Sequence, residues 1–206
     1  MTMPTAIPQP AQSTLVQPFP SAGPRIRQAY RELDQAANGT PAQIRALGEL
    51  NQLSRPWDPG TCTSRELRKE LWAWLDDVVT WLNHEYSWDV TDMIPSCWPQ
   101  HPHLVHEIAV LGDQRRIANT ALTSDRLEDW HRNSLPQFTD RLRTRTRNHC
   151  DDGHQPWPAK SRHTRHLAPT STRERTAAFD NDANSQRRSG LRIGVVDLNT
   201  GEITET

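Results

Sequence analysis

The chain has 206 residues, 34% of them hydrophobic and 24% charged, and its formal net charge is −1. This composition excludes a membrane-spanning protein, because no apolar run approaches the length of a span. A disulfide framework is also excluded, because the three cysteines are odd in number and lack framework spacing. The segment 1–23 lacks the basic and apolar regions of a signal peptide, so we expect a cytoplasmic protein with reduced thiols and no membrane partner.

The N-terminal quarter predicts a leader and two helices. Residues 1–24 are rich in proline and carry no charge, which is typical of a disordered segment. A helix is expected over 25–37, followed by an Asn-Gly stop signal. Thr40 begins a second helix with a capping box, and the apolar spacing extends this helix to Leu50 or Leu53.

The longest helix is predicted over 64–86. Thr63 and Glu66 form a capping box just before it. Its apolar residues recur at three- and four-residue steps, which places them on one helical face. They are Leu67, Leu71, Trp74, Leu75, Val78, Trp81, Leu82 and Tyr86. This face indicates a folded helical core.

Two further helices are expected after a loop over 88–99. The fourth helix runs from Pro102 to about Ala121, although Gly112 weakens its middle. Thr123 or Ser124 caps the fifth helix, which Pro136 should kink by removing a backbone donor. Its apolar face consists of Leu127, Trp130, Leu135, Phe138 and Leu142.

The sequence therefore divides into four expected regions: a disordered leader over 1–24, a helical domain over 25–155, a disordered basic linker over 156–189, and a tail over 190–206. The helical domain is predicted to be an all-α, compact bundle of about five helices. The tail contains a short apolar stretch that predicts a β-hairpin turning at residues 199–201.

Two Cys-x-x-x-His pairs, Cys97 with His101 and Cys150 with His154, offer a donor set that suits tetrahedral zinc. If the fourth and fifth helices pack antiparallel, the start of one lies near the end of the other and the pairs meet. The spacing differs from that of a standard zinc finger. The alternative is that both cysteines are small buried residues and both histidines lie on surface loops.

Positive charge gathers in the segment 141–175, whereas 57–130 is acidic. One stretch alternates arginine with neutral residues, at Arg141, Arg143, Arg145 and Arg147. This pattern suits contact with nucleic-acid phosphates or with the acidic domain itself. The alternative is a solvated helix end, where arginine stabilises the helix dipole. A GC-rich genome would also produce the preference for arginine over lysine.

The tryptophans predict two roles. Trp74 and Trp81 fall on the apolar face of the long helix, so core packing is expected for both. Trp72, Trp98 and Trp157 lie off that face and are candidates for a surface that contacts a protein partner.

The sequence carries no familiar catalytic motif: a nucleophile elbow, a Walker loop and a dinucleotide fingerprint are all absent. The segment 103–107 (HLVHE) has the wrong order for a zinc-protease helix. An enzyme is therefore the least supported class of protein.

Four segments combine tryptophan with proline, leucine or histidine: 55–59 (RPWDP), 71–75 (LWAWL), 97–102 (CWPQHP) and 129–150. Together they resemble a family of Trp-rich helical proteins encoded by actinobacteria and by their plasmids, integrated elements and phages. The resemblance covers about 55–158 and implies an accessory protein of a mobile element. The family has no established activity, so the resemblance implies no catalytic residue.

The leading hypothesis is a non-catalytic binding or adaptor protein that meets a protein partner through its tryptophans and touches nucleic acid through its basic segment. A zinc-stabilised helical module is the second hypothesis, and an enzyme of unknown class is the third.

Overall fold

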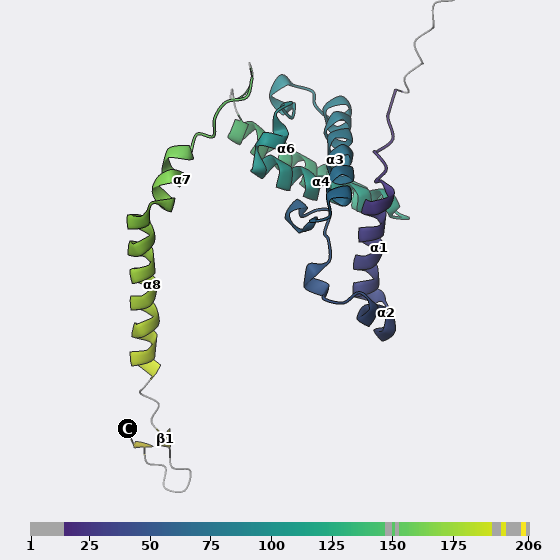
Figure 1. Ribbon diagram of the computed structural model, residues 1–206. Coiled ribbons are helices and arrows are strands. Elements are labelled where there is room, and N and C mark those ends of the chain that lie inside the picture. Colours follow the sequence, from purple (N-terminus) through teal and green to yellow (C-terminus); the bar gives the residue numbers. More distant parts are fainter. Residues whose placement is uncertain (1–14, 147–149, 151–152, 191–194, 197–202, 205–206) are drawn as a thin grey trace, which may run out of the picture. The chain divides into compact units, whose positions relative to one another are not determined.

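The computed structural model describes residues 15–146, 150, 153–190, 195–196 and 203–204 (Figure 1). The chain divides into two compact units, Met1–His154 and Gln155–Thr206. Among the described residues, no helix is long and apolar enough to cross a membrane.

The first unit is helical, which confirms the prediction of an all-α domain. Its α-helices are α1 (Pro24–Asn38), α2 (Pro41–Ala46), α3 (Arg65–Glu85), α4 (Pro102–Thr120), α5 (Asp125–Asp129) and α6 (Leu135–Thr146). A π turn over Trp130–Ser134 joins α5 to α6, so these three pieces correspond to the predicted fifth helix. Short 3-10 turns occupy Leu50–Gln52, Pro59–Thr61, Val90–Asp92 and Trp98–Gln100.

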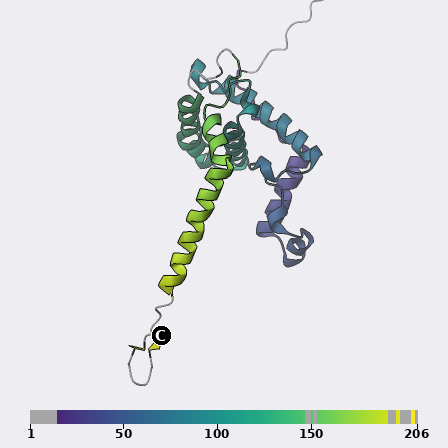
Figure 2. The same cartoon turned by 60° about the vertical axis from the view of Figure 1, so that its left-hand side comes forward.

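The core forms where α3 meets α1, α4 and the π turn (Figures 1 and 2). The predicted apolar face of α3 is buried, with Leu71, Leu75 and Val78 fully inaccessible. Trp81, Tyr86 and Trp130 meet in mutual edge or tilted contacts at 5.1–6.3 Å between ring centroids. Helix α3 is therefore the central element of the first unit, because its apolar face is the surface that the other elements cover.

Gly112 lies in the middle of α4, buried on the side that faces α3. A Cβ atom at this position would lie 3.4 Å from Val78 Cγ1 and 3.6 Å from the Trp74 ring. Both distances are ordinary van der Waals contacts, so the space beside Gly112 would accept a methyl group and close packing does not require glycine there.

Two helix boundaries depart from the prediction, and one predicted cap is confirmed. Helix α2 ends at Ala46 and not near Leu53, because Gly48 adopts a left-handed conformation (φ 72°) that stops the helix. Ser64, and not Thr63, caps α3, with its Oγ accepting from Leu67 N at 3.4 Å. The capping box at the start of α2 is confirmed, between Thr40 and Gln43.

The irregularity expected at Pro136 lies one turn earlier, in the π turn. This turn buries the Trp130 indole, whose Nε1 donates to the Leu111 carbonyl at 3.2 Å. The wider backbone allows the ring to enter the core while Pro136, near the start of α6, needs no partner for its nitrogen.

The end of the leader is ordered, which corrects the prediction of disorder up to residue 24. The Trp81 indole donates to the Gln17 carbonyl at 3.0 Å, and the Trp74 indole donates to the Pro20 carbonyl at 3.1 Å. Phe19 lies edge-on to both rings. Buried indole N–H groups need acceptors, and the leader backbone supplies them. Residues 1–14 lie outside the described residues.

The second unit contains α7 (Lys160–Leu167) and α8 (Pro169–Gly190), so the predicted disorder over 156–189 is wrong for these residues. Their sequences mix good helix formers such as Arg with weaker ones such as Ser and Thr, and α7 has no buried residue. Two two-residue strands, β1 (Val195–Val196) and β2 (Ile203–Thr204), pair antiparallel with Val196 opposite Ile203. The predicted turn at 199–201 lies outside the described residues.

Candidate metal centre

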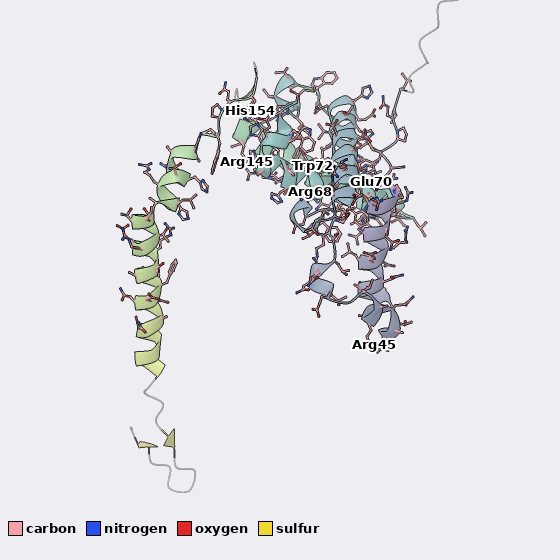
Figure 3. All side chains as sticks on the ribbon, viewed as in Figure 1. Arg45, Arg68, Glu70, Trp72, Arg145 and His154 are labelled. Carbon is pink, nitrogen blue, oxygen red and sulfur yellow. The ribbon has the colours of Figure 1, made fainter. Side chains whose placement is uncertain are left out.

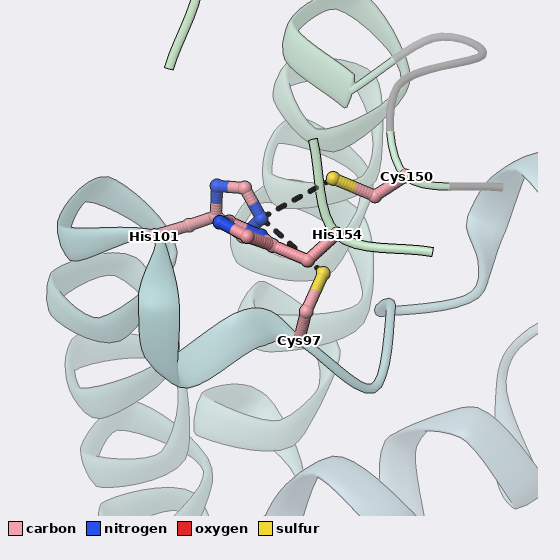
Figure 4. Close-up of side chains that lie close together, drawn as sticks. All are labelled: Cys97, His101, Cys150 and His154. Atoms are coloured by element: carbon pink, nitrogen blue, oxygen red, sulfur yellow. Dashed lines mark hydrogen bonds between the residues drawn. The ribbon is translucent and has the colours of Figure 1, made fainter. Parts of the chain in front are cut away.

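Four side chains from two distant segments lie together in the first unit: Cys97, His101, Cys150 and His154 (Figure 4). Each offers one ligand atom, and these four atoms all lie within 4.8 Å of one another. They are the two Cys-x-x-x-His pairs of the sequence. The start of α4 therefore lies beside the segment that follows α6, as the antiparallel arrangement of these helices requires.

The first pair belongs to a rigid stretch that leads into α4. Cys97 precedes the 3-10 turn Trp98–Gln100, and His101 is the residue that caps α4. Pro99 and Pro102 fix backbone angles on either side of His101. Trp98 holds the turn in place, because its side chain is only 2% exposed. Its ring centroid lies 5.9 Å from that of Trp72. Cys97 and His101 thus project from a segment with little conformational freedom.

The second pair is presented by an unusual backbone. Cys150 has a φ angle of 71°, in the left-handed region that residues with a Cβ rarely adopt, and Gly153 has a φ angle of 142°. A non-glycine residue in such a conformation costs about 1–3 kcal/mol and gathers at functional sites. The conformation directs the buried Cys150 sulfur toward His101.

The distances match those of a tetrahedral metal site. His101 Nε2 lies 3.3 Å from Cys97 Sγ and 3.5 Å from Cys150 Sγ. Zinc bonds of about 2.3 Å to sulfur and about 2.0 Å to nitrogen give sulfur–nitrogen edges of about 3.5 Å in a regular tetrahedron. The His101 and His154 rings lie 5.0 Å apart between centroids. An ion could be held at the centre of the four ligand atoms with only small movements.

The cluster is partly enclosed, with Cys150 buried, Cys97 and His101 half-buried, and His154 exposed. Burial raises the pKa of the Cys97 thiol, and the adjacent Cys150 raises it further. Two thiolates at this separation repel each other, and a divalent cation between them would offset that repulsion. His103 and His106 are exposed and, among the described residues, do not join the cluster.

The basic segment meets the acidic domain. Arg141 Nε lies 2.7 Å from a Glu107 carboxylate oxygen, and Arg145 pairs with the other oxygen of Glu107. Arg143 pairs with Asp92 at 2.5 Å, and the Asp92 contact raises the pKa of the Arg143 guanidinium. Arg147 lies outside the described residues. The described arginines of the basic segment therefore contact acidic residues of the same domain. Contact with nucleic acid stays a prediction.

The three candidate tryptophans of the partner surface have different environments. Trp98 is buried, which corrects its assignment to a surface, because it packs under the start of α4. Trp72 is partly buried beside Trp98 and lies near Arg68 on α3 (Figure 3). Trp157 is 55% exposed. Trp88, which the sequence did not single out, is 97% exposed in the loop after α3.

One further feature was missed at the sequence level. The Arg115 guanidinium lies 5.4–5.6 Å from the ring centroids of Phe19, Trp81 and Trp130. Its charge is stabilised by three aromatic faces from three different elements. No local pattern would have indicated it, because these rings come together only in the folded chain.

Searches of the chain against protein-family models, curated proteins and solved structures find no match.

Proposed function

We propose that this chain binds one zinc ion through Cys97, His101, Cys150 and His154, and that the ion stabilises the helical domain. The observation that carries this proposal is the convergence of four suitable ligand atoms within 4.8 Å from segments on either side of α4, α5 and α6. Two thiolates and two imidazoles form a donor set that zinc prefers in structural sites. Carboxylate-binding cations such as magnesium are disfavoured by the same set.

The structural role follows from the number of ligands. Four protein ligands complete a tetrahedral shell, whereas catalytic zinc sites keep one position for water or substrate. The ion would therefore join the start of α4 to the chain after α6 and offset the cost of the left-handed Cys150. The proposal is of a non-catalytic module, in line with the accessory role in a mobile element that the resemblance implies.

The first experiment is measurement of the metal content of the purified, untagged chain by plasma mass spectrometry. We expect about one zinc per chain, lost in a Cys97→Ser/Cys150→Ser variant. Cys62→Ser is the matched control, because Cys62 is a buried thiol that lies outside the cluster. The Cys62 thiol contacts the Arg55 carbonyl instead, at 3.7 Å. Zinc that is absent from the parent chain, or retained by the double variant, would refute the proposal.

Cobalt substitution tests the geometry separately. A Co²⁺-loaded chain should show the intense visible absorption of a tetrahedral site together with thiolate-to-metal charge-transfer bands. His154→Ala should change this spectrum, because His154 supplies the exposed fourth ligand. A spectrum of octahedral cobalt would contradict the closed four-ligand site.

A further inference from the structure

A second candidate site lies in a groove formed by the end of the leader, α1 and α4. Its cavity has a volume of about 420 Å³, within the range of small-molecule sites. Leader residues Phe19, Pro20, Ser21 and Ala22 form one wall, and side chains of α1 and α4 form the others. The groove contains none of the four residues of the Cys/His cluster.

Three arginines line this groove, and no carboxylate is among its described lining residues. Arg27 and Arg31 come from α1, and Arg116 comes from α4. Asp113 pairs with Arg116 at 2.8 Å and compensates one of the three charges. The groove therefore keeps an excess of positive charge, within a domain where acidic residues outnumber basic ones over 57–130.

Arg116 is already fixed in place. Its Nε and Nη2 both donate to Asp113 Oδ1, at 3.0 and 2.8 Å, and its guanidinium carbon lies 3.5 Å from the Tyr30 ring centroid. Arg27 donates to the Ala22 carbonyl at 2.5 Å, and Arg31 donates to Gln28. These contacts use only part of the five N–H donors of each guanidinium, so donors are left for a ligand.

Neutral groups complete the lining. Ser21, Asn119 and Thr120 add polar side chains, and Phe19, Pro20 and Ala22 add apolar surface. Arginine forks recognise the oxygens of phosphate, and the adjacent apolar wall suits the organic part of a phosphate ester. We propose that this groove binds an organic phosphate ester, either a free nucleotide or the phosphorylated end of a nucleic-acid strand.

The test is isothermal titration calorimetry of the metal-loaded full chain with AMP, inorganic phosphate, adenosine and a short 5′-phosphorylated oligonucleotide. We expect AMP to bind about tenfold more tightly than inorganic phosphate or adenosine, because each of these lacks half of the recognised chemistry. Tighter binding of the oligonucleotide than of AMP would identify a strand as the source of the phosphate. Weaker binding of the oligonucleotide would identify the free nucleotide.

An Arg27→Gln/Arg31→Gln variant should weaken AMP binding by about tenfold, since it removes two of the three guanidinium groups from exposed positions of the groove. The matched control is Arg45→Gln/Arg126→Gln, which removes the same charge from exposed positions outside the groove. If both variants lose the same affinity for AMP, the loss comes from the change in net charge, and a specific site is refuted. Absence of saturable AMP binding, or adenosine binding as tight as that of AMP, would also refute it. Neither result bears on zinc, which is measured separately.

Discussion

The aromatic core around α3 and the Cys/His cluster beside α4 are held together by different forces. In the core, large apolar rings are buried, and their indole N–H groups are satisfied by backbone carbonyls of Gln17, Pro20 and Leu111. In the cluster, four polar side chains meet on loops, one of them in a left-handed conformation. Apolar periodicity thus specifies the helices, whereas the Cys/His cluster adds four donor atoms to a junction of α4 and α6 that buried Phe138 and Leu142 and the ion pairs of Glu107 already hold.

Trp130→Ala should have the largest effect, because it removes the ring at the centre of the aromatic contacts. Trp130 is 1% exposed and touches Trp81, Tyr86 and Arg115. We expect a loss of about 3–5 kcal/mol in the free energy of unfolding, measured by urea denaturation. The variant should still bind one zinc per chain while it is folded. Loss of zinc from a folded variant would show that core and cluster are one cooperative unit.

Removal of the metal should lower the free energy of unfolding by a comparable amount, which depends on the metal concentration. A ligand present at about a thousand times its Kd stabilises a protein by about 4 kcal/mol. A strong chelator should therefore lower the melting temperature of the parent chain and leave that of the Cys97→Ser/Cys150→Ser variant unchanged. A chelator that destabilises both proteins equally would contradict a specific site.

Phe19→Ala tests whether the leader belongs to the core. The ring is partly buried against Trp74 and Trp81, so we expect a loss of about 1–2 kcal/mol and a change in tryptophan fluorescence. Leu15→Ala is the matched control, because Leu15 is 99% exposed. If the two substitutions have the same effect, the leader contributes nothing to the core.

Glu107→Gln should have the smallest effect. It weakens two ion pairs with half-exposed arginines, Arg141 and Arg145, and we expect a loss of about 0.5–1 kcal/mol that shrinks in high salt. Glu128→Gln is the control, because its partner Arg132 is 75% exposed. Zinc affinity should fall slightly in Glu107→Gln alone, since these pairs hold the end of α6 against α4. An effect that persists in high salt would argue against ion pairing.

The sequence predicted what depends on periodicity. The apolar steps of Leu71, Leu75 and Val78 placed α3, and two equal Cys-x-x-x-His spacings identified the four clustered side chains. The π turn, the burial of Trp98 and the docking of Phe19 escaped prediction, because each depends on contacts between residues distant in sequence. The helices α7 and α8 escaped prediction because their sequences carry few apolar residues and so lack the periodic apolar face on which the prediction of helices rested.

The four ligands of the cluster are synthesised at different times. Cys97 and His101 leave the ribosome first, and Cys150 and His154 follow only after α4, α5 and α6 have been made. A zinc ion bound early would have two ligands and would exchange readily, because all four ligand atoms come together only once α6 has turned back along α4. Metal capture would then act as a final check on the nascent domain, because only a correctly folded chain can retain the ion.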